Sequence, residues 1–425
     1  MLFLSVFVVL MVLGVPLAFT VGMPALLYIF NDPFTPITIG VQRMISITQN
    51  FPLLAVPFFV LAGNLMIETG ITKRLVKFST YLTGHIIGGL SHVTIVLSAL
   101  MGGISGSAVA DASMQSRLLG PTMIEERGFS KGYSAGVIGL SGLITSTIPP
   151  SIGLIQYGYV GEVSIGRLFV AGVVPGILMA IFMMVAAYIV SKKKDYEPVR
   201  EERASLKEIS ISFKNSFLAL IFPFVLIMGI RFGVFTPTEG GAFAVVYSFV
   251  IGKFVYKEIT WEKLEEVLGQ ALIDVGVIMF IIACSGIFGY VITTEKLPAT
   301  VAQFLIGITE QPLLLLFIIL GFLLLAGMVM EATVNVLLLT PIFLPIIKQV
   351  GIDPVHFGIL MVVMLTMGGL TPPVGVAMYA VCSILDVPID EYAVESLPFI
   401  LSVIVLLAVL AIFPQLVMFL PNLIY

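Results

Sequence analysis

Long apolar segments separated by short polar connections run along almost the whole chain. About 20 consecutive apolar residues cross the hydrocarbon core of a bilayer, so the pattern predicts an all-α polytopic membrane protein. The first segment stays apolar to Phe30 without a basic leader, and we expect a crossing there rather than a cleaved signal peptide. The expected crossings are 2–30, 51–68, 131–160, 166–191, 216–235, 238–256, 270–294, 355–386 and 393–421.

Two further apolar stretches, 86–124 and 312–350, are interrupted near their middle by small and polar residues. The first interruption is GISGSAVAD at 103–111, and the second is GMVMEATVN at 327–335. Glycine favours irregular backbone, which survives in a bilayer only where protein or a water-filled cavity surrounds it. We therefore expect two re-entrant helical hairpins whose tips surround something polar.

Two proline pairs interrupt crossings in a similar way, within STIPPS at 146–151 and GGLTPPVG at 368–375. Proline lacks an N–H group and frees a carbonyl one turn earlier in a helix. Such carbonyls, together with neighbouring Ser and Thr hydroxyls, are hard oxygen ligands for a small cation. Helices that begin at Ser107 and near Thr333 direct their positive N-terminal ends to the same place, which suits an anion. The four interruptions therefore predict a sodium site beside a bound carboxylate.

A purely structural explanation of the same residues is also open. Glycines permit close helix packing, and hydroxyls bond back to the carbonyl one turn earlier; both features are common in membrane helices. A single interruption would leave the two explanations equally supported. Four interruptions in a paired pattern favour transport.

The order of parts in the first half of the chain recurs in the second half. In each, a crossing precedes an interfacial segment, an interrupted hairpin, a proline-broken crossing and a further crossing. Asp111 and Asn335 lie 224 positions apart (335 minus 111). Two copies of one unit inserted in opposite senses form an inverted repeat, which is typical of secondary transporters. The expected division is an N-terminal scaffold with an interfacial arm at 1–85, a first transport half at 86–191, a cytoplasmic loop with scaffold helices and a second arm at 192–311, and a second transport half at 312–425.

Composition and charge define the class of the chain and its orientation. Of 425 residues, 59% are hydrophobic and 11% are charged, and the mean hydropathy of +1.12 excludes a soluble globular protein. The loop 192–215 is rich in Lys and Arg, so the positive-inside rule predicts that it is cytoplasmic. Counting crossings from this loop, the first hairpin enters from the cytoplasm and the second from outside. The 3 histidines and 2 cysteines are scattered, so no metal site beyond sodium is indicated.

Few charged residues lie within the apolar segments, and each has its own explanation. Asp111 lies at the start of a helix, where a carboxylate can offset sodium charge or hold the hairpin tip, and Glu331 is its counterpart in the second hairpin. Glu239 follows Thr236 at the spacing of a capping box and is expected to cap a helix. The basic residues within 73–77 are expected to anchor an interfacial helix to lipid headgroups rather than to contact the substrate.

Five motifs along the chain are distinctive in combination. They are FPLLAVPFF at 51–59, GISGSAVAD at 103–111, IPPS at 148–151, GIDPVHFG at 351–358 and LTPPVG at 370–375. Together they resemble the large membrane (M) subunit of the tripartite ATP-independent periplasmic (TRAP) transporters, and the resemblance extends over essentially the whole chain. Thr147 departs from the family pattern, because a glycine often precedes Ile-Pro-Pro there.

The resemblance implies a sodium-driven elevator importer of the bacterial inner membrane, in which a transport domain carrying both hairpins slides against a scaffold. It also implies two protein partners. One is a small four-helix membrane (Q) subunit, and the other is a periplasmic binding protein that delivers an organic acid such as a C4-dicarboxylate or a sialic acid. The family's sodium ligands correspond here to Gly103, Ser105, Ser107, Ser146, Thr147, Thr333, Gly369 and Thr371. A substrate-contacting or charge-balancing role is assigned to Asp111, Glu331, Asn335, Pro150 and Pro373.

Three alternative functions are compatible with a polytopic chain. A proton-coupled transporter is disfavoured because the centre of the membrane offers only Asp111 and Glu331 and no histidine relay. A membrane-embedded enzyme is disfavoured because no Ser/His, metal-binding or paired-carboxylate arrangement is evident. A channel fits hairpins from opposite faces less well than alternating access does. We therefore expect a transporter rather than an enzyme, with sodium as the coupling ion, no other cofactor and no nucleic-acid partner.

Overall fold

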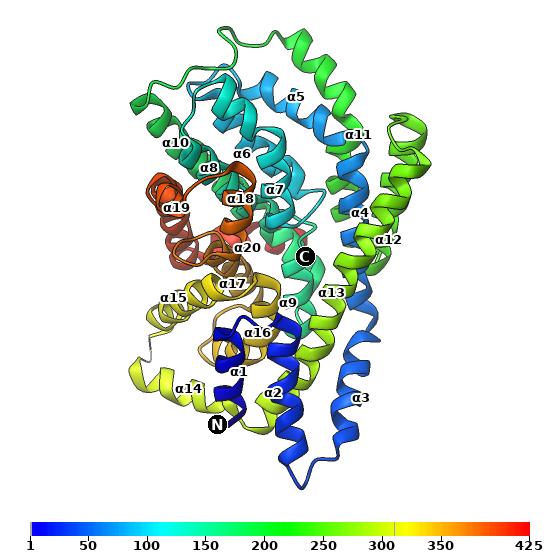
Figure 1. The fold of residues 1–425 in the computed structure, drawn as a ribbon, viewed down its shortest axis with the longest axis vertical. Helices are drawn as coiled ribbons and strands as arrows, with labels where there is room; N and C mark the ends of the chain where they lie inside the picture. The colour runs from blue at the N-terminus through cyan, green and yellow to red at the C-terminus, as the bar shows by residue number, and fades with distance from the viewer. Residues whose placement is uncertain (1, 310) are drawn as a thin grey trace.

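A computed structural model describes residues 2–309 and 311–425, without the side chains of Leu2 and Ile306. Every regular element among these residues is a helix (Figure 1). The α-helices are α1 Leu2–Val12, α2 Leu17–Asn31, α3 Ile37–Thr48, α4 Ala55–Glu68, α5 Ile71–Thr83, α6 Gly89–Gly102, α7 Ala108–Leu118, α8 Lys131–Thr147, α9 Ile152–Val160, α10 Ile165–Lys193, α11 Leu206–Arg231, α12 Pro237–Val250, α13 Trp261–Thr294, α14 Leu297–Ile308, α15 Pro312–Val329, α16 Ala332–Gln349, α17 Pro354–Gly369, α18 Val376–Leu385, α19 Ile389–Ile412 and α20 Pro414–Ile424. Three short segments complete the set: a 3₁₀ turn η1 Phe51–Leu54 and two π segments, η2 Thr122–Glu126 and η3 Ile251–Val255.

Eight spans within the described residues are long and apolar enough to cross a membrane. The pair α8 and α9 is a ninth candidate, bent by 45° at its break. These lengths and compositions confirm the predicted class, an all-α polytopic membrane protein. The predicted crossing 166–191 matches α10, and 238–256 matches α12 with η3. The eight spans are η1 with α4, α10, α11, α12 with η3, α13, α15, α16 and α19.

The N-terminal segment differs from the prediction of one crossing over 2–30. The chain turns between α1 and α2 at Gly14, whose φ is 70°, and Pro16 precedes the second helix. The ring of Phe3, near the start of α1, lies 5.8 Å from the ring of Tyr28, near the end of α2. The two short helices therefore run antiparallel against each other, and the prediction of a single continuous crossing is wrong.

The C-terminal segment also differs from the single crossing predicted over 393–421. Helix α19 ends at Ile412, and Pro414 begins the separate helix α20. Proline suits the first turn of a helix because its missing N–H has no intrahelical partner there. Helix α20 packs on α10. The prediction is therefore wrong after Ile412.

The long helix α13 runs antiparallel to α3 and α4. Glu68, at the end of α4, pairs with Lys263, near the start of α13, at 3.7 Å between Oε2 and Nζ. Asn64 donates to Asp274 at 3.0 Å. Applying the offset of 224 positions to the α3–α4 range of 37–68 gives 261–292, which is almost the whole of α13. Helices at equivalent positions in the two halves therefore point in opposite directions.

The remaining elements of the two halves also lie toward opposite ends of the molecule. Figure 1 shows α5 near the upper end and α14 near the lower end. The hairpin of α6 and α7 lies in the upper half, and the hairpin of α15 and α16 lies in the lower half. The helices α3, α4, α12 and α13 line the right-hand side, whereas α10, α15, α17 and α19 lie on the left.

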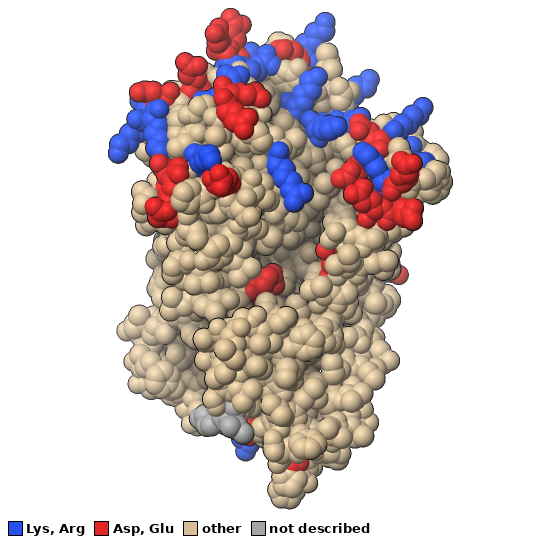
Figure 2. Space-filling model, in the orientation of Figure 1, with Lys and Arg blue, Asp and Glu red and all other residues tan. Residues whose placement is uncertain are grey.

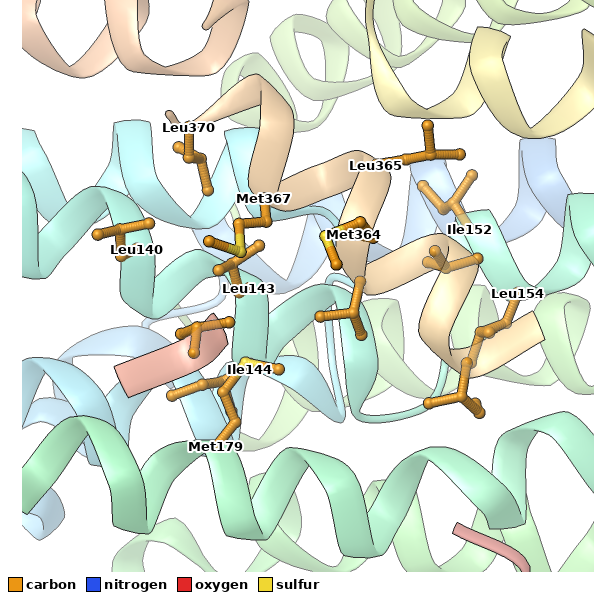
Figure 3. Packing of buried hydrophobic residues seen from close by; sticks show 14 of the residues in the cluster. Leu140, Leu143, Ile144, Ile152, Leu154, Met179, Met364, Leu365, Met367 and Leu370 are labelled. Carbon is orange, nitrogen blue, oxygen red and sulfur yellow. The ribbon is translucent and has the colours of Figure 1, made fainter. Parts of the chain in front are cut away.

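The centre of the fold is built on α8 and α17. Every residue of α8 after Lys131, and every residue of α17 after Pro354, is buried. A helix that is apolar on all sides is stable only when protein surrounds it or lipid does. Figure 3 shows Leu143 and Ile144 of α8 facing Met364 and Met367 of α17 in one apolar layer. The C-terminal ends of these helices, where the proline pairs follow, consequently lie inside protein.

Charged side chains gather at one end of the molecule. Figure 2 shows Lys, Arg, Asp and Glu concentrated at the upper end, where α5, the end of α10 and the start of α11 lie, above a broad band with few charged side chains, among them an acidic group near the centre. A band of this kind matches the hydrocarbon region of a bilayer. The lower end carries few charges on this face.

Candidate functional site

The tip of the first hairpin is pressed against two other elements. Gly106 has a φ of 62°, and a Cβ atom there would lie 2.0 Å from the carbonyl oxygen of Pro150. A Cβ atom on Gly103 would lie 2.0 Å from Cγ of Pro223 in α11. Only glycine fits such close approaches. The tip at 103–107 therefore packs directly on the first proline break and on α11.

Two predicted ligands, Ser105 and Ser107, have different surroundings at this tip. Ser107 is the N-cap of α7 and accepts a hydrogen bond from the Ala110 N–H at 3.3 Å. Ser105 is buried, and its Oγ has no hydrogen-bond partner among the described residues. A buried hydroxyl without a partner is uncommon and calls for an explanation. The lone pairs of Ser105 Oγ are thus available to a ligand.

Asp111 is the centre of a buried polar network. It is 1% exposed, and its Oδ2 accepts hydrogen bonds from Ser98 Oγ at 2.7 Å, Thr145 Oγ1 at 2.8 Å and Gln115 Nε2 at 2.9 Å. Ser98 Oγ also lies 3.0 Å from Ser141 Oγ. Oδ1 of Asp111 has no partner among the described residues. One oxygen of a buried carboxylate is therefore fully used and the other is open.

Sequence reasoning missed the residues around Asp111. Gln115 had a usable signal, because it follows Asp111 by four positions and so lies on the same face of α7. Ser98 lies on α6, and Ser141 and Thr145 lie on α8, so only the packing of three helices brings them together. Gln156 on α9 was also missed; it is buried, and neither of its amide atoms has a partner within the described part of the chain.

The tip of the second hairpin is capped by a carboxylate. Glu331 is the N-cap of α16, and its Oε2 accepts from the N–H groups of Thr333 at 2.9 Å and Val334 at 3.3 Å. The Thr333 hydroxyl donates to the same oxygen. Glu331 thus occupies the N–H groups that were expected to face an anion, which makes the start of α16 less suited to an anionic ligand than the start of α7.

Asn335 holds the second hairpin together. Its Nδ2 donates to the carbonyls of Met330 at 2.9 Å and Ala326 at 3.1 Å, so it links α16 to the end of α15. The side chain is fully buried, and its Oδ1 has no partner among the described residues. Asn335 therefore has a clear structural role and one open oxygen.

The hydroxyls at the two proline breaks bond back along their own helices. Thr147 Oγ1 donates to the Leu143 carbonyl at 2.7 Å, and Ser146 Oγ donates to the same carbonyl at 3.0 Å. Thr371 Oγ1 donates to the Met367 carbonyl at 2.6 Å. The packing explanation predicts these bonds, but a hydroxyl that donates still has lone pairs for a cation. The peptide bonds Pro149-Pro150 and Pro372-Pro373 are both cis.

Each hairpin tip packs on the proline break of its own half. In the second half, a Cβ atom on Gly327 would lie 2.3 Å from the Leu365 carbonyl oxygen, and one on Gly369 would lie 3.7 Å from the Gly327 carbonyl oxygen. The helices beyond the breaks connect the halves, because α9 packs on α16 and α18 packs on α7. Pro150 is buried beside the first tip, whereas Pro373 is exposed. The predicted residues therefore lie in two groups, each at the tip and the proline break of one half.

Residues 4–416 match the family model described as the tripartite ATP-independent periplasmic transporter, DctM component. The chain belongs to this family. The sialic acid TRAP transporter large permease protein SiaM of Vibrio cholerae is 38% identical over 410 residues, which cover 96% of this chain and 95% of SiaM. The C4-dicarboxylate TRAP transporter large permease protein DctM of Rhodobacter capsulatus is 33% identical, covering 98% of this chain and 97% of DctM.

A solved structure of much lower sequence identity has the same fold as this TRAP transporter component. The YdaH transporter of Alcanivorax borkumensis superposes with a TM-score of 0.61 over 98% of both chains, at 13% sequence identity. The all-helical architecture is therefore one that membrane transporters use. Identity this low supports the fold alone.

Nδ1 of His92, near the start of α6, is an unpartnered buried nitrogen on the first hairpin. The other unpartnered buried atoms among the described residues of the two hairpins of this TRAP transporter component are oxygens. They are Oγ of Ser105, Oδ1 of Asp111, Oε1 of Gln115 and Oδ1 of Asn335. Within residues 2–309 and 311–425, no group of three His, Cys, Asp or Glu side chains could hold a metal ion. Oxygen ligands of this kind suit hard cations rather than transition metals.

Proposed function

We propose that this TRAP transporter component is the large membrane subunit of a sodium-coupled importer for an organic acid. The names of the relatives support a substrate of the sialic acid or C4-dicarboxylate class. The arrangement of paired hairpins and broken helices supports secondary transport, because such interruptions form binding sites in transporters.

The open oxygen of Asp111 carries the proposal of sodium coupling. Three donors hold Oδ2, and Oδ1 has no partner among the described residues. A buried carboxylate without a counter-charge costs several kcal/mol, and a bound cation removes much of that cost. Ser105 Oγ and Gln115 Oε1 are further open oxygens on the same hairpin. A small hard cation such as sodium matches this set of donors.

The tip and the break that pack together in each half supply the proposed sodium ligands. In the first half these are Gly103, Ser105, Ser107, Ser146 and Thr147, and in the second half they are Thr333, Gly369 and Thr371. Backbone carbonyls contribute at the glycines, and hydroxyl lone pairs contribute at Ser and Thr. Asp111 and Glu331 balance the sodium charge, while Asn335, Pro150 and Pro373 line the space for the substrate.

An elevator motion of two domains is part of the proposal. The transport domain comprises 86–191 and 312–425, and the scaffold comprises 1–85 and 192–311. This division is supported by the packing within each domain. The first hairpin packs on α8 and the second on α17, whereas α4 packs on α12 and both α3 and α4 pack on α13. The opposite directions of α3–α4 and α13 support an inverted repeat. Two contacts, Gly103 with Pro223 and Gly63 with Ser105, then lie on the sliding surface.

The proposed setting is the bacterial inner membrane, with the segment 192–215 in the cytoplasm; this segment was predicted as a loop, but it includes the first turns of α11. The gathering of charged residues at one end of the molecule supports this orientation through the positive-inside rule (Figure 2). Two protein partners are proposed, a small four-helix membrane subunit and a periplasmic binding protein. The words tripartite and periplasmic in the family description, and large permease in the names of relatives, support both partners.

Uptake by the reconstituted complex tests the proposal. The chain is incorporated into proteoliposomes with its small subunit and its cognate binding protein, and labelled sialic acids and C4-dicarboxylates are offered with and without an inward sodium gradient. We expect uptake of one organic acid that requires the sodium gradient and the binding protein. Uptake that follows a pH gradient and ignores sodium would replace the proposal with proton coupling. Covalent conversion of the substrate would replace it with a membrane-embedded enzyme.

A further inference from the structure

A separate cavity opens at the charged end of the molecule. It has a volume of about 690 Å³ and lies between α5, the first part of α11 and the segment that joins α12 to α13. Cavities of this size hold small ligands or headgroups. It is remote in sequence from both hairpin tips. Its charged lining residues are Lys73, Arg74, Lys77, Lys214 and Glu258.

Arg74 forms a fixed wall of this cavity. Its Nη1 pairs with Oε1 of Glu258 at 3.3 Å and donates to the Gly70 carbonyl at 2.9 Å. Its guanidinium lies 3.8 Å from the centre of the Tyr256 ring. Stacking and pairing hold the planar guanidinium in one position. The charge of Glu258 is therefore offset within the wall and does not oppose an anion in the cavity.

Three lysines remain as the free positive charges of the cavity. Lys73 and Lys77 are four positions apart on α5 and so lie on one face of that helix, and Lys214 reaches the same cavity from α11. All three are exposed, and none forms an ion pair within the described part of the chain. Three ammonium groups around one space attract an anion with several acceptor oxygens.

Two apolar side chains line the cavity beside its charged groups. They are Leu218 of α11, which is partly buried, and Val255 of η3, which is 53% exposed. The opposite face of α5 is buried through residues such as Leu75 and Phe78. An amphipathic helix of this kind lies in the membrane interface, where headgroups meet acyl chains.

We propose that this cavity binds the phosphate headgroup of an anionic phospholipid, with the acyl chains along Leu218 and Val255. The lysines supply the charge, and the two apolar side chains distinguish a lipid from a free phosphate ion. Basic pockets between helices at the cytoplasmic surface bind anionic headgroups in this way. The bound lipid would join α5 to α11 and to the segment between α12 and α13. This site is independent of the transported substrate.

Native mass spectrometry of the detergent-purified full chain tests the proposal. The probes are phosphatidylglycerol, phosphatidylethanolamine of the same acyl chains, and inorganic phosphate. The pocket variant is K73Q/K77Q/K214Q, and the matched control K192Q/K193Q/K207Q removes three exposed lysines at the same end of the molecule that do not line the cavity. A lysine near an anionic surface contributes about fivefold, so we expect the pocket variant to bind phosphatidylglycerol roughly a hundredfold more weakly and the control to bind it normally.

Three results would overturn the proposal. An equal loss in both variants would mean that only the overall charge matters. Equal binding of phosphatidylglycerol and phosphatidylethanolamine would show that the cavity does not select an anionic headgroup. Displacement of the lipid by low concentrations of inorganic phosphate would identify a free anion as the ligand. Thermal unfolding without added lipid establishes that the pocket variant is folded, and Val255→Ser provides a second variant that should weaken lipid binding while leaving the lysines in place.

Discussion

In the first hairpin the returning helix, α7, is capped by the Ser107 hydroxyl, and its carboxylate, Asp111, lies one turn further on. In the second hairpin the equivalent positions, 224 residues later, hold the reverse arrangement: Glu331 is the cap of α16, and the neutral Asn335 lies one turn inside. Each hairpin therefore keeps one carboxylate near the start of its returning helix. The two carboxylates occupy positions four residues apart in the repeat.

This shift changes what surrounds each charge. Glu331 accepts hydrogen bonds from the start of its own helix, so the helix dipole stabilises it locally. Asp111 accepts from Ser98 on α6 and Thr145 on α8, and its second oxygen is open. The second hairpin is thus largely self-sufficient, while the charge of the first depends on neighbouring helices and on the proposed cation. Sequence symmetry between repeats does not imply equal chemistry.

Asn335→Asp is expected to have the largest effect. The substitution places a carboxylate at the position that Asp111 has in the first hairpin. This carboxylate would face the carbonyl oxygens of Met330 and Ala326, which accept hydrogen bonds and cannot donate them. A buried uncompensated charge costs about 3–5 kcal/mol, so we expect little folded protein. Yield and size-exclusion chromatography measure this outcome. A normal yield would show that the second hairpin tolerates the chemistry of the first.

Asp111→Asn is the reciprocal change, and we expect it to fold, because the amide oxygen still accepts from Ser98 and Thr145. Loss of one charge from a buried pair costs about 2 kcal/mol or more, which is roughly thirtyfold in sodium affinity. The sodium dependence of uptake in proteoliposomes measures it. Glu331→Gln is the matched control, with an expected loss of about fivefold, because its charge acts mainly on the start of α16. A larger loss in Glu331→Gln than in Asp111→Asn would reverse the comparison.

Gly106→Ala tests the shape of the first tip rather than its charge. We expect a destabilisation of more than about 1 kcal/mol for two reasons. The backbone φ of Gly106 is positive, and an added Cβ atom would lie 2.0 Å from the Pro150 carbonyl oxygen. Gly128→Ala is the control, with a φ of 67° and nothing within 4 Å of its Cβ position. Thermal unfolding in detergent compares them. The equivalent position of the second tip is Met330, which has a side chain. Equal melting temperatures for Gly106→Ala and Gly128→Ala would show that the first tip also tolerates a side chain there.

Ser107→Ala and Thr371→Ala are expected to have the smallest effects. Each removes one proposed oxygen ligand, one from each half, and Ser107→Ala also removes a helix cap worth about 1 kcal/mol. We expect sodium activation to weaken a few-fold in both, with the fold retained. Thr366→Ala is the control for Thr371, since Thr366 makes the same backward hydrogen bond, at 2.7 Å, within α17 rather than at its break. Unchanged sodium activation in both variants would remove these residues from the ligand set.

Local backbone chemistry explains the predictions that the structure confirms. The capping box of Thr236 and Glu239 is present, with the Glu239 N–H donating to Thr236 Oγ1 at 3.2 Å. Ser107 begins α7, as its position after Gly106 indicates. The prediction over 2–30 failed because hydropathy alone was weighed there. Gly14 and Pro16 carried the same kind of signal as the tips and breaks, and they turn the chain.

The sequence by itself determined the all-helical membrane class, the interruptions within 86–124 and 312–350, the two proline breaks and the offset of 224 positions between Asp111 and Asn335. Hydropathy, glycine and proline act through their own stretch of backbone, so their effects can be predicted without knowing the neighbours. Only the tertiary structure decided that Asp111 meets Ser98 and Thr145, and that each tip packs on the break of its own half. Those contacts join helices far apart in the chain, and which helices become neighbours depends on how the whole set of apolar faces packs.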